Sequence, residues 1–428
     1  MRVLVVGAGV TGLLTAWYLR QEGCTVTVVE KEPSPARGTS FANGAQLSYS
    51  YVAPLAGPGV LPKIPAWLLR KDAPLRLRPM ADWRQWRWMA EFVLACTARQ
   101  SERTTQKLLR LAFYSRDLMH RFLSSPLGAN VSFQHRTNGK LVVYSDADSF
   151  AGARDQVAFQ QSLGCEQQLL GASECLSLEP SLASRDSSLG RRVVGGVYTP
   201  SEEVGDCYTF CVQLEKLLRS QGVTFEYQCD IHALKVAQGR VASALTYSGE
   251  IFADSFVLAS GTDSTRLAAT VGLYLPVYPL KGYSLTLPCA EGAPRVSVTD
   301  FARKIVYAPL DDGQASTVLR VAGLADLEGH HAGIDPARLC VLLTEADRAF
   351  PQVTAGYQSV ANVRAWAGLR PATPTGLPIL GRSRFPNLYL NTGHGALGWT
   401  LGHGSAKLVS DLLCGNPTAV ASNDFTGS

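Results

Sequence analysis

The sequence lacks several patterns that would mark a particular class of protein. Its ten cysteines stand singly, with no C-x-x-C pair, and glycines at 7, 9 and 12 break the apolar run at the N-terminus. We therefore expect no secretory leader, and reduced thiols in a cytoplasmic protein. No stretch reaches the ~18 consecutive apolar residues of a spanning helix, so we expect no transmembrane segment, while attachment to a membrane surface stays open.

Neither an internal repeat nor a low-complexity linker interrupts the 428 residues. The composition, 46% hydrophobic and 18% charged, is typical of a globular protein and excludes disorder, collagen and coiled coil for the whole chain. At ~100 to 200 residues per domain, the length predicts two or three domains.

A nucleotide-binding pattern opens the chain. Residues 3–29 read as an apolar strand, a helix and a second strand, and Gly7, Gly9 and Gly12 form a G-x-G-x-x-G turn after the first strand. Such glycines let the backbone approach a pyrophosphate at a helix N-terminus, and Glu30 would accept hydrogen bonds from ribose hydroxyls. The pattern predicts a dinucleotide site, with a tight structural turn as the alternative.

Two later segments favour FAD over NAD. In residues 252–261 and 388–395 an apolar strand is followed by small residues, as happens where a chain passes close to a flat ligand. In an open parallel sheet these strand ends share one crevice with the first strand. Residues 391–400 then open a helix whose N-terminal dipole would stabilise the anion of a reduced flavin. An ordinary glycine-rich loop is the alternative.

The order of these patterns predicts an α/β fold with a discontinuous, Rossmann-like FAD-binding domain and an inserted α+β substrate domain that contains a mixed sheet. We assign residues 1–50, 150–270 and 360–428 to the FAD-binding domain. Residues 51–149 and 271–359 are assigned to the substrate-binding domain.

The net charge of +5 is concentrated in a basic, Trp-rich helical segment, residues 63–110. Eleven Lys and Arg face four Asp and Glu there, a local charge of +7, so the remainder of the chain totals −2. The segment holds four of the seven tryptophans and follows a proline-punctuated apolar stretch. Aromatic rings beside cations suit an anionic membrane surface, which predicts a peripheral contact through residues 54–110. A helical subdomain with solvated arginines is the alternative.

Further motifs carry a resemblance to a known family. They are residues 38–48 (GTSFANGAQLS), 276–286 (PVYPLKGYSLT), 368–374 (GLRPATP) and 390–400 (LNTGHGALGWT). With them, the sequence from Val3 to about Leu413 resembles the bacterial D-amino-acid dehydrogenases of the D-amino-acid oxidase and glycine oxidase superfamily. The resemblance implies non-covalent FAD, a D-amino acid as substrate, and electrons passed to a membrane quinone pool at the inner face of the cell membrane.

Some positions depart from the family pattern. Gly44-Ala45 reverses the usual Ala-Gly order beside the expected flavin ring, and Pro309 stands near the place where relatives similar to glycine oxidase carry an arginine for the substrate carboxylate. Gly368 stands where similar sarcosine oxidases carry the cysteine that binds flavin covalently, which supports non-covalent attachment. The chain also ends soon after its last helix, where a longer tail was expected.

Oxidation of an amine by hydride transfer from Cα to flavin N5 depends mainly on geometry, and the sequence shows no Ser-His-Asp or paired-carboxylate arrangement. The site needs a partner for the substrate carboxylate, best supplied by arginine. Arg370 is the first candidate, followed by Arg320 and Arg303. Tyr283 and Tyr51 are candidate walls or hydroxyl donors.

His394 is expected near the flavin ring, where it would tune reduction or contact substrate. No His, Cys, Asp or Glu cluster has the spacing of a metal site, so no metal is expected. The full set of predicted cofactor-binding residues is Gly7, Gly9, Val10, Thr11, Gly12, Glu30, Lys31, Thr39, Ser40, Ala42, Asn43, Gly44, Gln46, Ala259, Gly261, Gly368, Arg370, Gly393, His394, Gly395, Leu397, Gly398, Trp399 and Thr400.

The predicted reaction is therefore oxidative deamination of D-amino acids, with small or apolar side chains, to 2-oxo acids and ammonia. The runner-up is an oxygen-using amine oxidase acting on glycine, sarcosine or a D-imino acid. An FAD-dependent RNA-modifying protein would use residues 63–110 as a nucleic-acid patch, although we expect no nucleic acid as partner. A flavoprotein without turnover is the remaining alternative.

Overall fold

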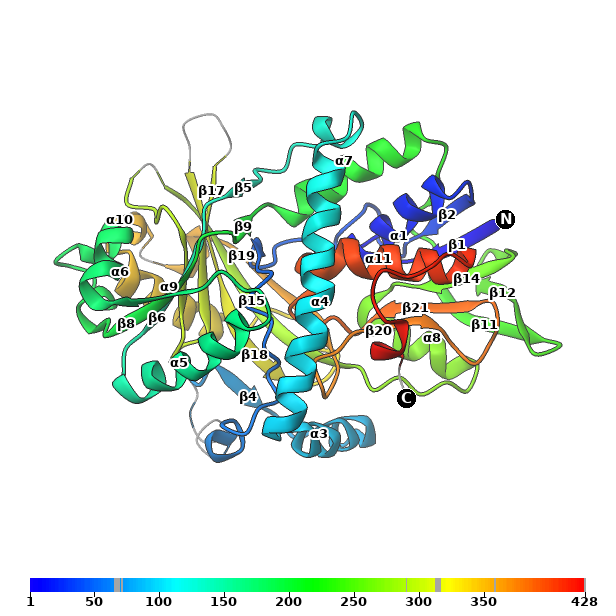
Figure 1. Cartoon of the computed structure of the whole chain (residues 1–428). Coiled ribbons are helices and arrows are strands. Elements are labelled where there is room, and N and C mark those ends of the chain that lie inside the picture. The colour runs from blue at the N-terminus through cyan, green and yellow to red at the C-terminus, as the bar shows by residue number, and fades with distance from the viewer. Residues whose placement is uncertain (65–69, 71, 290, 312–316, 358, 427–428) are drawn as a thin grey trace.

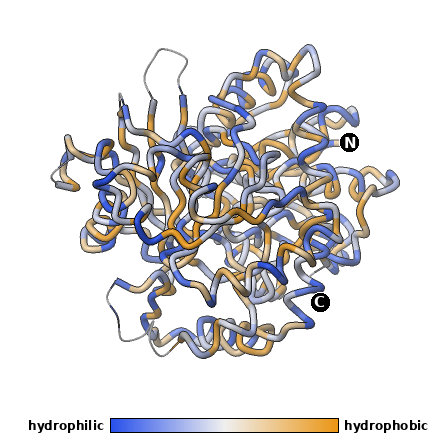
Figure 2. Tube along the Cα trace, turned by 60° about the vertical axis from the view of Figure 1, so that its left-hand side comes forward, coloured by the Kyte–Doolittle hydropathy of each residue, from blue (hydrophilic) through white to orange (hydrophobic). Residues whose placement is uncertain are grey.

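The computed structural model describes residues 1–428 except 65–69, 71, 290, 312–316, 358 and 427–428. Two large sheets lie at opposite ends of the molecule, with the long helix α4 (Ala98–Leu123) between them (Figure 1). The hydropathy of the trace shows apolar stretches running through the interior, whereas many peripheral turns are hydrophilic (Figure 2).

The first sheet is a Rossmann-like, mostly parallel sheet. Its strands lie in the order β10 (Thr224–Glu226), β2 (Thr25–Val29), β1 (Arg2–Val6), β14 (Ser255–Leu258), β21 (Leu388–Thr392) and β20 (Ile379–Arg382). Only β20 among these six runs antiparallel to its neighbour. The sheet is built from three separated parts of the chain, which confirms the predicted α/β fold.

Both faces of this sheet are covered, which explains why its strands are continuously apolar. Along β1, Val3 and Val5 point into one core while Leu4 and Val6 point into another. This alternation is the two-residue period of a strand. Helices α1 (Val10–Gln21), α7 (Cys207–Ser220) and α11 (Gly398–Cys414) contribute to the first core. Helix α8 (Ser264–Thr270) and the small sheet β11 (Ile231–Ala237), β12 (Arg240–Thr246) and β13 (Gly249–Ile251) cover the second.

The second large sheet is mixed. Its strands lie in the order β19 (Arg364–Ala372), β15 (Tyr278–Cys289), β18 (Thr317–Leu327), β17 (Ile305–Asp311), β16 (Ser297–Asp300), β6 (Lys140–Tyr144), β8 (Gly195–Thr199) and β7 (Gln168–Gly171), and β4 (Leu75–Leu77) pairs with β18. The β16–β6 and β18–β4 pairs are parallel and the others antiparallel. This is the predicted mixed sheet.

The two sheets divide the chain differently from the predicted domain ranges. Strands β7 and β8 fall in 150–270, and β19 falls in 360–428, yet all three pair within the mixed sheet. The reason is visible in β19, which pairs with β15 over nine residues, from Arg364 opposite Thr286 to Ala372 opposite Tyr278. Periodicity identifies a strand but does not identify the sheet that it joins.

Two helices, α3 (Trp83–Ala95) and α4, overlap the segment 63–110 that was predicted to be helical. Asp82 caps α3 by accepting a hydrogen bond from the Arg84 N–H, and Thr97 caps α4 in the same way through Gln100. The sequence reading missed helices α5 (Ala147–Gln161) and α9 (Pro336–Ala349), as well as the short helices α6 (Ala172–Leu178) and α10 (Pro351–Thr354). In the part of the chain that the structure describes, no helix is long and apolar enough to cross a bilayer.

A small sheet joins the two halves. Strand β9 (Glu203–Val204) pairs antiparallel with β3 (Gln46–Leu47) and with β5 (Arg136–Thr137). Strand β3 lies in the segment 38–48, so its pairing with β9 holds that segment against the same strand as β5.

Candidate active site

A cavity of about 1340 Å³ lies where the ends of β1, β2, β14 and β21 face strands β15, β18 and β19 of the mixed sheet. Pockets for drug-sized ligands measure about 300 to 1000 Å³, so this cavity has room for a dinucleotide and a substrate together. Of the predicted cofactor-binding residues, all line it except Gly12 and Gly393.

These two glycines shape the backbone beside the cavity instead. A Cβ on Gly12 would lie 1.9 Å from the Gly7 carbonyl oxygen, so this glycine lets helix α1 start directly against the strand end. Gly393 has φ +81° and its Cβ would lie 2.8 Å from Thr373 Cγ2. Both glycines are packed against other chain segments, and their part in cofactor binding stays a prediction.

The first turn has the shape of a phosphate cradle. Gly7 adopts φ +107°, and a Cβ there would lie 2.7 Å from the Ala259 carbonyl oxygen. Helix α1 starts after Gly9, and its Val10 N–H donates to Ser40 Oγ at 3.1 Å. The helix N-terminus, with its partial positive charge, opens on the cavity.

Glu30 is held in place by the backbone at the end of β2. Its two carboxylate oxygens accept hydrogen bonds from the N–H groups of Ala8 (2.7 Å) and Glu32 (3.1 Å). Burial raises its pKa, although these two hydrogen bonds oppose the shift. The neighbouring Lys31 pairs with Asp263 at 2.6 Å across the mouth of the cavity.

Residues 38–48 are tied to both halves of the molecule. Thr39 Oγ1 donates to the Leu369 carbonyl (2.8 Å), Ser284 Oγ donates to the Ala42 carbonyl (2.6 Å), and the Ser48 N–H donates to Thr400 Oγ1 (3.1 Å). The irregular segment is therefore held rigidly along the cavity wall.

The reversed order of Gly44 and Ala45 has a structural consequence. Ala45 takes the left-handed conformation, φ +55°, which costs an alanine about 1 kcal/mol. At Gly44 space is short, because a Cβ would lie 3.2 Å from Val306 Cγ2. Ala45 is fully buried against Val204 and Ala308, which compensates for its strained backbone.

The glycine-rich turn before α11 places His394 in the wall. His394 Nε2 lies 3.0 Å from Ser405 Oγ, and burial lowers the pKa of the histidine to about 4. The imidazole is therefore neutral at pH 7. The Gly395 N–H donates to the Pro371 carbonyl at 2.8 Å, and residues 397–400 bring the N-terminus of α11 to the cavity.

Arg370, on β19, presents its guanidinium to the cavity across β15. It lies over Gly282, where a Cβ would stand 2.2 Å from Arg370 Nη2, and its Nη1 donates to the Leu324 carbonyl at 3.0 Å. Burial lowers its pKa to about 10, against the attraction of Asp326, so the group stays charged at neutral pH. Gly282 thus provides the space that this arginine occupies.

Tyr283 lines the cavity, but its hydroxyl points away into a charged network. It donates to Asp326 Oδ2 at 2.8 Å, and burial together with the Asp326 charge raises its pKa far above the usual value. The phenolic proton is thus committed to Asp326. Tyr283 serves the cavity as a wall.

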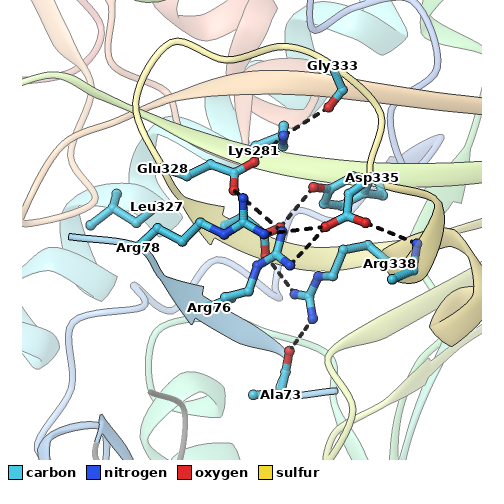
Figure 3. A network of polar contacts seen from close by, with 12 residues as sticks. Ala73, Arg76, Arg78, Lys281, Leu327, Glu328, Gly333, Asp335 and Arg338 are labelled. Atoms are coloured by element: carbon cyan, nitrogen blue, oxygen red, sulfur yellow. Dashed lines mark hydrogen bonds and ion pairs between the residues drawn. The ribbon is translucent and has the colours of Figure 1, made fainter. Parts of the chain in front are cut away.

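The network behind Tyr283 fastens β4 to the mixed sheet and to α9 (Figure 3). Arg76 pairs with Asp326 and, at 2.9 Å, with Asp335, while Arg338 donates to the Ala73 carbonyl at 2.8 Å. Arg78 and Lys281 both pair with Glu328. Because Pro74 and Leu75 line the cavity, this network holds one of its walls.

The other two arginine candidates do not line the cavity. Arg320 donates to the Asn43 carbonyl (2.9 Å) and pairs with Asp206 (3.1 Å), while Arg303 pairs with Asp72 (3.3 Å) and with Glu345. Arg320 therefore positions the backbone of the cofactor-binding segment. Pro309 also lies outside the cavity, and its carbonyl accepts a hydrogen bond from Arg136.

Gly368 lines the cavity where there is little room for a side chain. A Cβ at this position would lie 2.0 Å from Trp366 Cη2, so a cysteine would not fit without displacing the indole. This supports non-covalent binding of the cofactor. In the described part of the chain, no group of three or more His, Cys, Asp or Glu could hold a metal ion.

The sequence reading missed an ionisable residue at the cavity, Lys140, and a buried carboxyl group near it, Glu202. Lys140 begins β6, and its ammonium lies 4.1 Å from the centre of the Tyr51 ring. The charge of Glu202 opposes the lowering of the Lys140 pKa by burial. A lysine at the start of the fully buried strand KLVVY was the available signal, because lysine is rarely buried without a partner.

Comparison with known proteins agrees with this site. The model of the DAO family, described as FAD dependent oxidoreductase, matches residues 2–412. The chain therefore belongs to this family of FAD-dependent oxidoreductases.

Relatives cover the full chain. D-amino acid dehydrogenase 2 of Ralstonia nicotianae is 47% identical, covering 99% of each chain, and D-amino acid dehydrogenase 2 of Pseudomonas aeruginosa is 44% identical, covering 100% of this chain and 97% of its own. Among solved structures, glycine oxidase from Geobacillus kaustophilus superposes with a TM-score of 0.79 at 21% identity, covering 100% and 98% of the two chains. That likeness confirms the Rossmann-like fold.

FAD is the cofactor of this family, and the residues of the cavity fit it. Gly7, Gly9 and the α1 N-terminus would hold the pyrophosphate, and Glu30 the ribose. The segments 38–48 and 393–400 would hold the flavin end. When bound, FAD supplies an acceptor for the substrate's hydride.

Proposed function

We propose that this protein is an FAD-dependent D-amino-acid dehydrogenase that yields 2-oxo acids and ammonia and passes its electrons to a quinone or another respiratory acceptor. The names and full-length coverage of the curated relatives support the reaction. The observation that carries the proposal is a charged arginine, Arg370, in a cavity whose other walls suit a dinucleotide.

In this proposal Arg370 binds the substrate carboxylate. Its fork of N–H groups matches a carboxylate, and one nitrogen is already fixed to the Leu324 carbonyl. His394 is proposed as a neutral contact beside the flavin ring. Tyr283 and Tyr51 are proposed as walls that orient the substrate.

The side-chain preference is proposed to be small or apolar. The cavity continues from Arg370 past Leu280, Trp88 and Phe92 toward residues 54–60. Trp88 is buried, with its indole N–H donating to the Ala372 carbonyl at 2.8 Å. Turnover of D-aspartate or D-glutamate alone would refute this preference.

The quinone acceptor and the membrane contact are supported by the surface of α3 and its neighbours. Trp83 is 60% exposed, Trp86 50% and Leu94 78%. Arg84 lies over the Trp83 ring at 5.7 Å. Exposed indoles beside arginines suit the headgroup layer of an anionic membrane such as the inner face of the cell membrane. Trp67, also counted in this segment, lies outside the described residues.

Anaerobic mixing with D- and L-amino acids, followed by flavin absorbance, tests the proposal. We expect D-enantiomers to bleach the flavin and L-enantiomers to leave it oxidised. On readmission of an acceptor, an artificial quinone should reoxidise it much faster than oxygen. Peroxide formed in equal amount to product would instead favour the amine oxidase, and binding of RNA with a steep salt dependence would favour an RNA-modifying protein.

A further inference from the structure

Two consecutive glutamates, Glu202 and Glu203, lie buried at β9 and differ sharply in their surroundings. Glu203 is fully satisfied: it accepts hydrogen bonds from His135 Nε2 at 2.9 Å and from the Tyr49 hydroxyl at 3.3 Å, and it also pairs with His120. Although burial opposes ionisation, the two histidines lower the pKa of Glu203. This carboxylate is held charged and is occupied by partners.

Only one of the two carboxylate oxygens of Glu202 accepts a hydrogen bond. It is 1% exposed, and its Oε1 accepts the Ser50 N–H at 2.7 Å, while its Oε2 has no hydrogen-bond partner among the described residues. Burial raises the pKa of Glu202 to about 7, with Lys140 opposing the shift. Its carboxyl group can therefore gain or lose a proton at neutral pH.

Lys140 connects this carboxyl group to the cavity. It is 2% exposed, and its Nζ donates to Gln46 Oε1 at 2.8 Å and to Ser48 Oγ at 3.0 Å. Burial lowers the pKa of Lys140 to about 8, against the opposing effect of Glu202. Lys140, Gln46, Ser48 and Tyr51 all line the cavity.

Ser48 stands between the two charged groups. Its Oγ accepts from Lys140, and its hydroxyl favours the ionised form of Glu202. Three other titratable groups interact electrostatically with this region. The charge of Glu202 acts on Tyr49 and on Cys165, and Tyr51 acts on Tyr144. Arg116 acts on Tyr49 and on Cys165 from α4.

This arrangement differs from a structural ion pair in the same protein. Lys281 contacts Glu328 directly, donates to the Gly333 carbonyl, and does not line the cavity (Figure 3). Lys140 and Glu202 have no such direct contact; Ser48 accepts a hydrogen bond from Lys140 and lies close enough to Glu202 to favour its charged form. A purely structural role would favour direct pairing, because a buried charge is stabilised most by a bonded partner.

An amino acid reaches the cavity mainly as a zwitterion, whereas its oxidation needs a neutral amine. We propose that Lys140, Ser48 and Glu202 form the proton acceptor of the cavity, which takes one proton from the substrate ammonium group before oxidation. Lys140 first passes a proton through Ser48 to Glu202, and its free amine then accepts the proton as the substrate N–H bond breaks. The substrate becomes an anion with a neutral amine, while the protein gains one positive charge, so charge and protons balance.

A direct test uses ¹⁵N-labelled 2-aminoisobutyrate bound to the FAD-loaded protein at pH 7. This probe has the amine and carboxylate of a substrate but no Cα hydrogen, so it cannot be oxidised. We expect its nitrogen resonance to be that of a neutral amine in the wild-type protein and of an ammonium in Lys140→Met, which removes the accepting amine. The matched control Glu203→Gln should behave as wild type. An ammonium in the wild type, or a neutral amine in Lys140→Met, would overturn the proposal.

The second test is the pH dependence of the limiting rate of flavin reduction by D-alanine under anaerobic conditions. In the wild type the rate should rise with pH through an apparent pKa near that of the Glu202 carboxyl group. In Lys140→Met it should fall by roughly 10²-fold at pH 7, the lower end of the range for loss of a general base, and recover at high pH. Unchanged profiles would refute the assignment.

Ser48→Ala removes a single oxygen and covers the case in which Lys140→Met does not fold, and it should shift the profile in the same direction. The inference rests on the proposed D-amino-acid substrate. If no D-amino acid reduces the wild-type flavin, that function fails, whereas the ¹⁵N measurement still reports on the proton acceptor alone.

Discussion

Replacement of Arg370 by methionine is the sharpest test of the substrate site. The guanidinium is charged at neutral pH, lies over Gly282 and has one nitrogen fixed to the Leu324 carbonyl. The other nitrogens remain for a carboxylate. Truncating one partner of a buried, hydrogen-bonded charge pair costs about 2 to 5 kcal/mol. At about 1.4 kcal/mol per factor of ten, Arg370→Met should lower the second-order rate constant of flavin reduction roughly 30- to 4000-fold.

Arg370→Lys separates charge from shape. Lysine keeps the positive charge but loses the planar fork, so we expect a loss intermediate between wild type and Arg370→Met, mostly in apparent substrate affinity. The assay is anaerobic stopped-flow reduction with increasing D-alanine, compared with a D-amino-acid amide that has no carboxylate. The loss should be large for the acid and small for the amide.

The matched control is Arg303→Met, because Arg303 is engaged by Asp72 and Glu345 and does not line the cavity. It should reduce stability without changing the ratio of acid to amide rates. If Arg370→Met left the rate with D-alanine within threefold of wild type, or affected acid and amide equally, a carboxylate contact at this arginine would be refuted.

Three further predictions follow from particular contacts. Gly12→Ala should abolish FAD retention, measured by flavin absorbance after gel filtration, since its Cβ would stand 1.9 Å from the Gly7 carbonyl oxygen; a yellow, active variant would contradict this close packing. Trp83→Ser with Trp86→Ser should weaken sedimentation with anionic vesicles while leaving reduction by D-alanine unchanged, and equal sedimentation would argue against α3 as the contact. Burial lowers the pKa of His403 to about 3, below its value in the unfolded chain, so this residue contributes stability that is present above pH ~6.5 and lost as pH falls toward 3. His403→Gln should therefore flatten the acid limb of the unfolding free energy in urea titrations, and an unchanged limb would exclude His403 as its source.

The cofactor half of the site could be predicted from the sequence because the residues that determine it lie close together in the chain. The turn of Gly7, Gly9 and Gly12, the apolar strand before it and Glu30 after the second strand lie within thirty residues. The conformational demands of a tight turn and a helix start act over a few residues, so they leave a readable pattern. The same holds for the strand that runs into Gly261.

The substrate half depended on contacts between residues far apart in the chain. Arg320 and Arg370 look alike in sequence, yet one pairs with Asp206 and the other opens on the cavity. Which face of a strand an arginine occupies follows from the register of β15 with β18 and β19, and register is decided by tertiary packing. For the same reason the sequence does not show that β19 pairs with β15 in the mixed sheet.

Residue chemistry in the sequence decided the class of cofactor and the general fold, because glycine turns and apolar periodicity are properties of short segments. Tertiary structure alone decided the ionisation of the cavity. Lys140, Ser48 and Glu202 come from three separate strands or loops, and only their joint burial gives two of them pKa values near neutrality. Burial and charge pairing arise when distant segments meet, so no window of the sequence contains them.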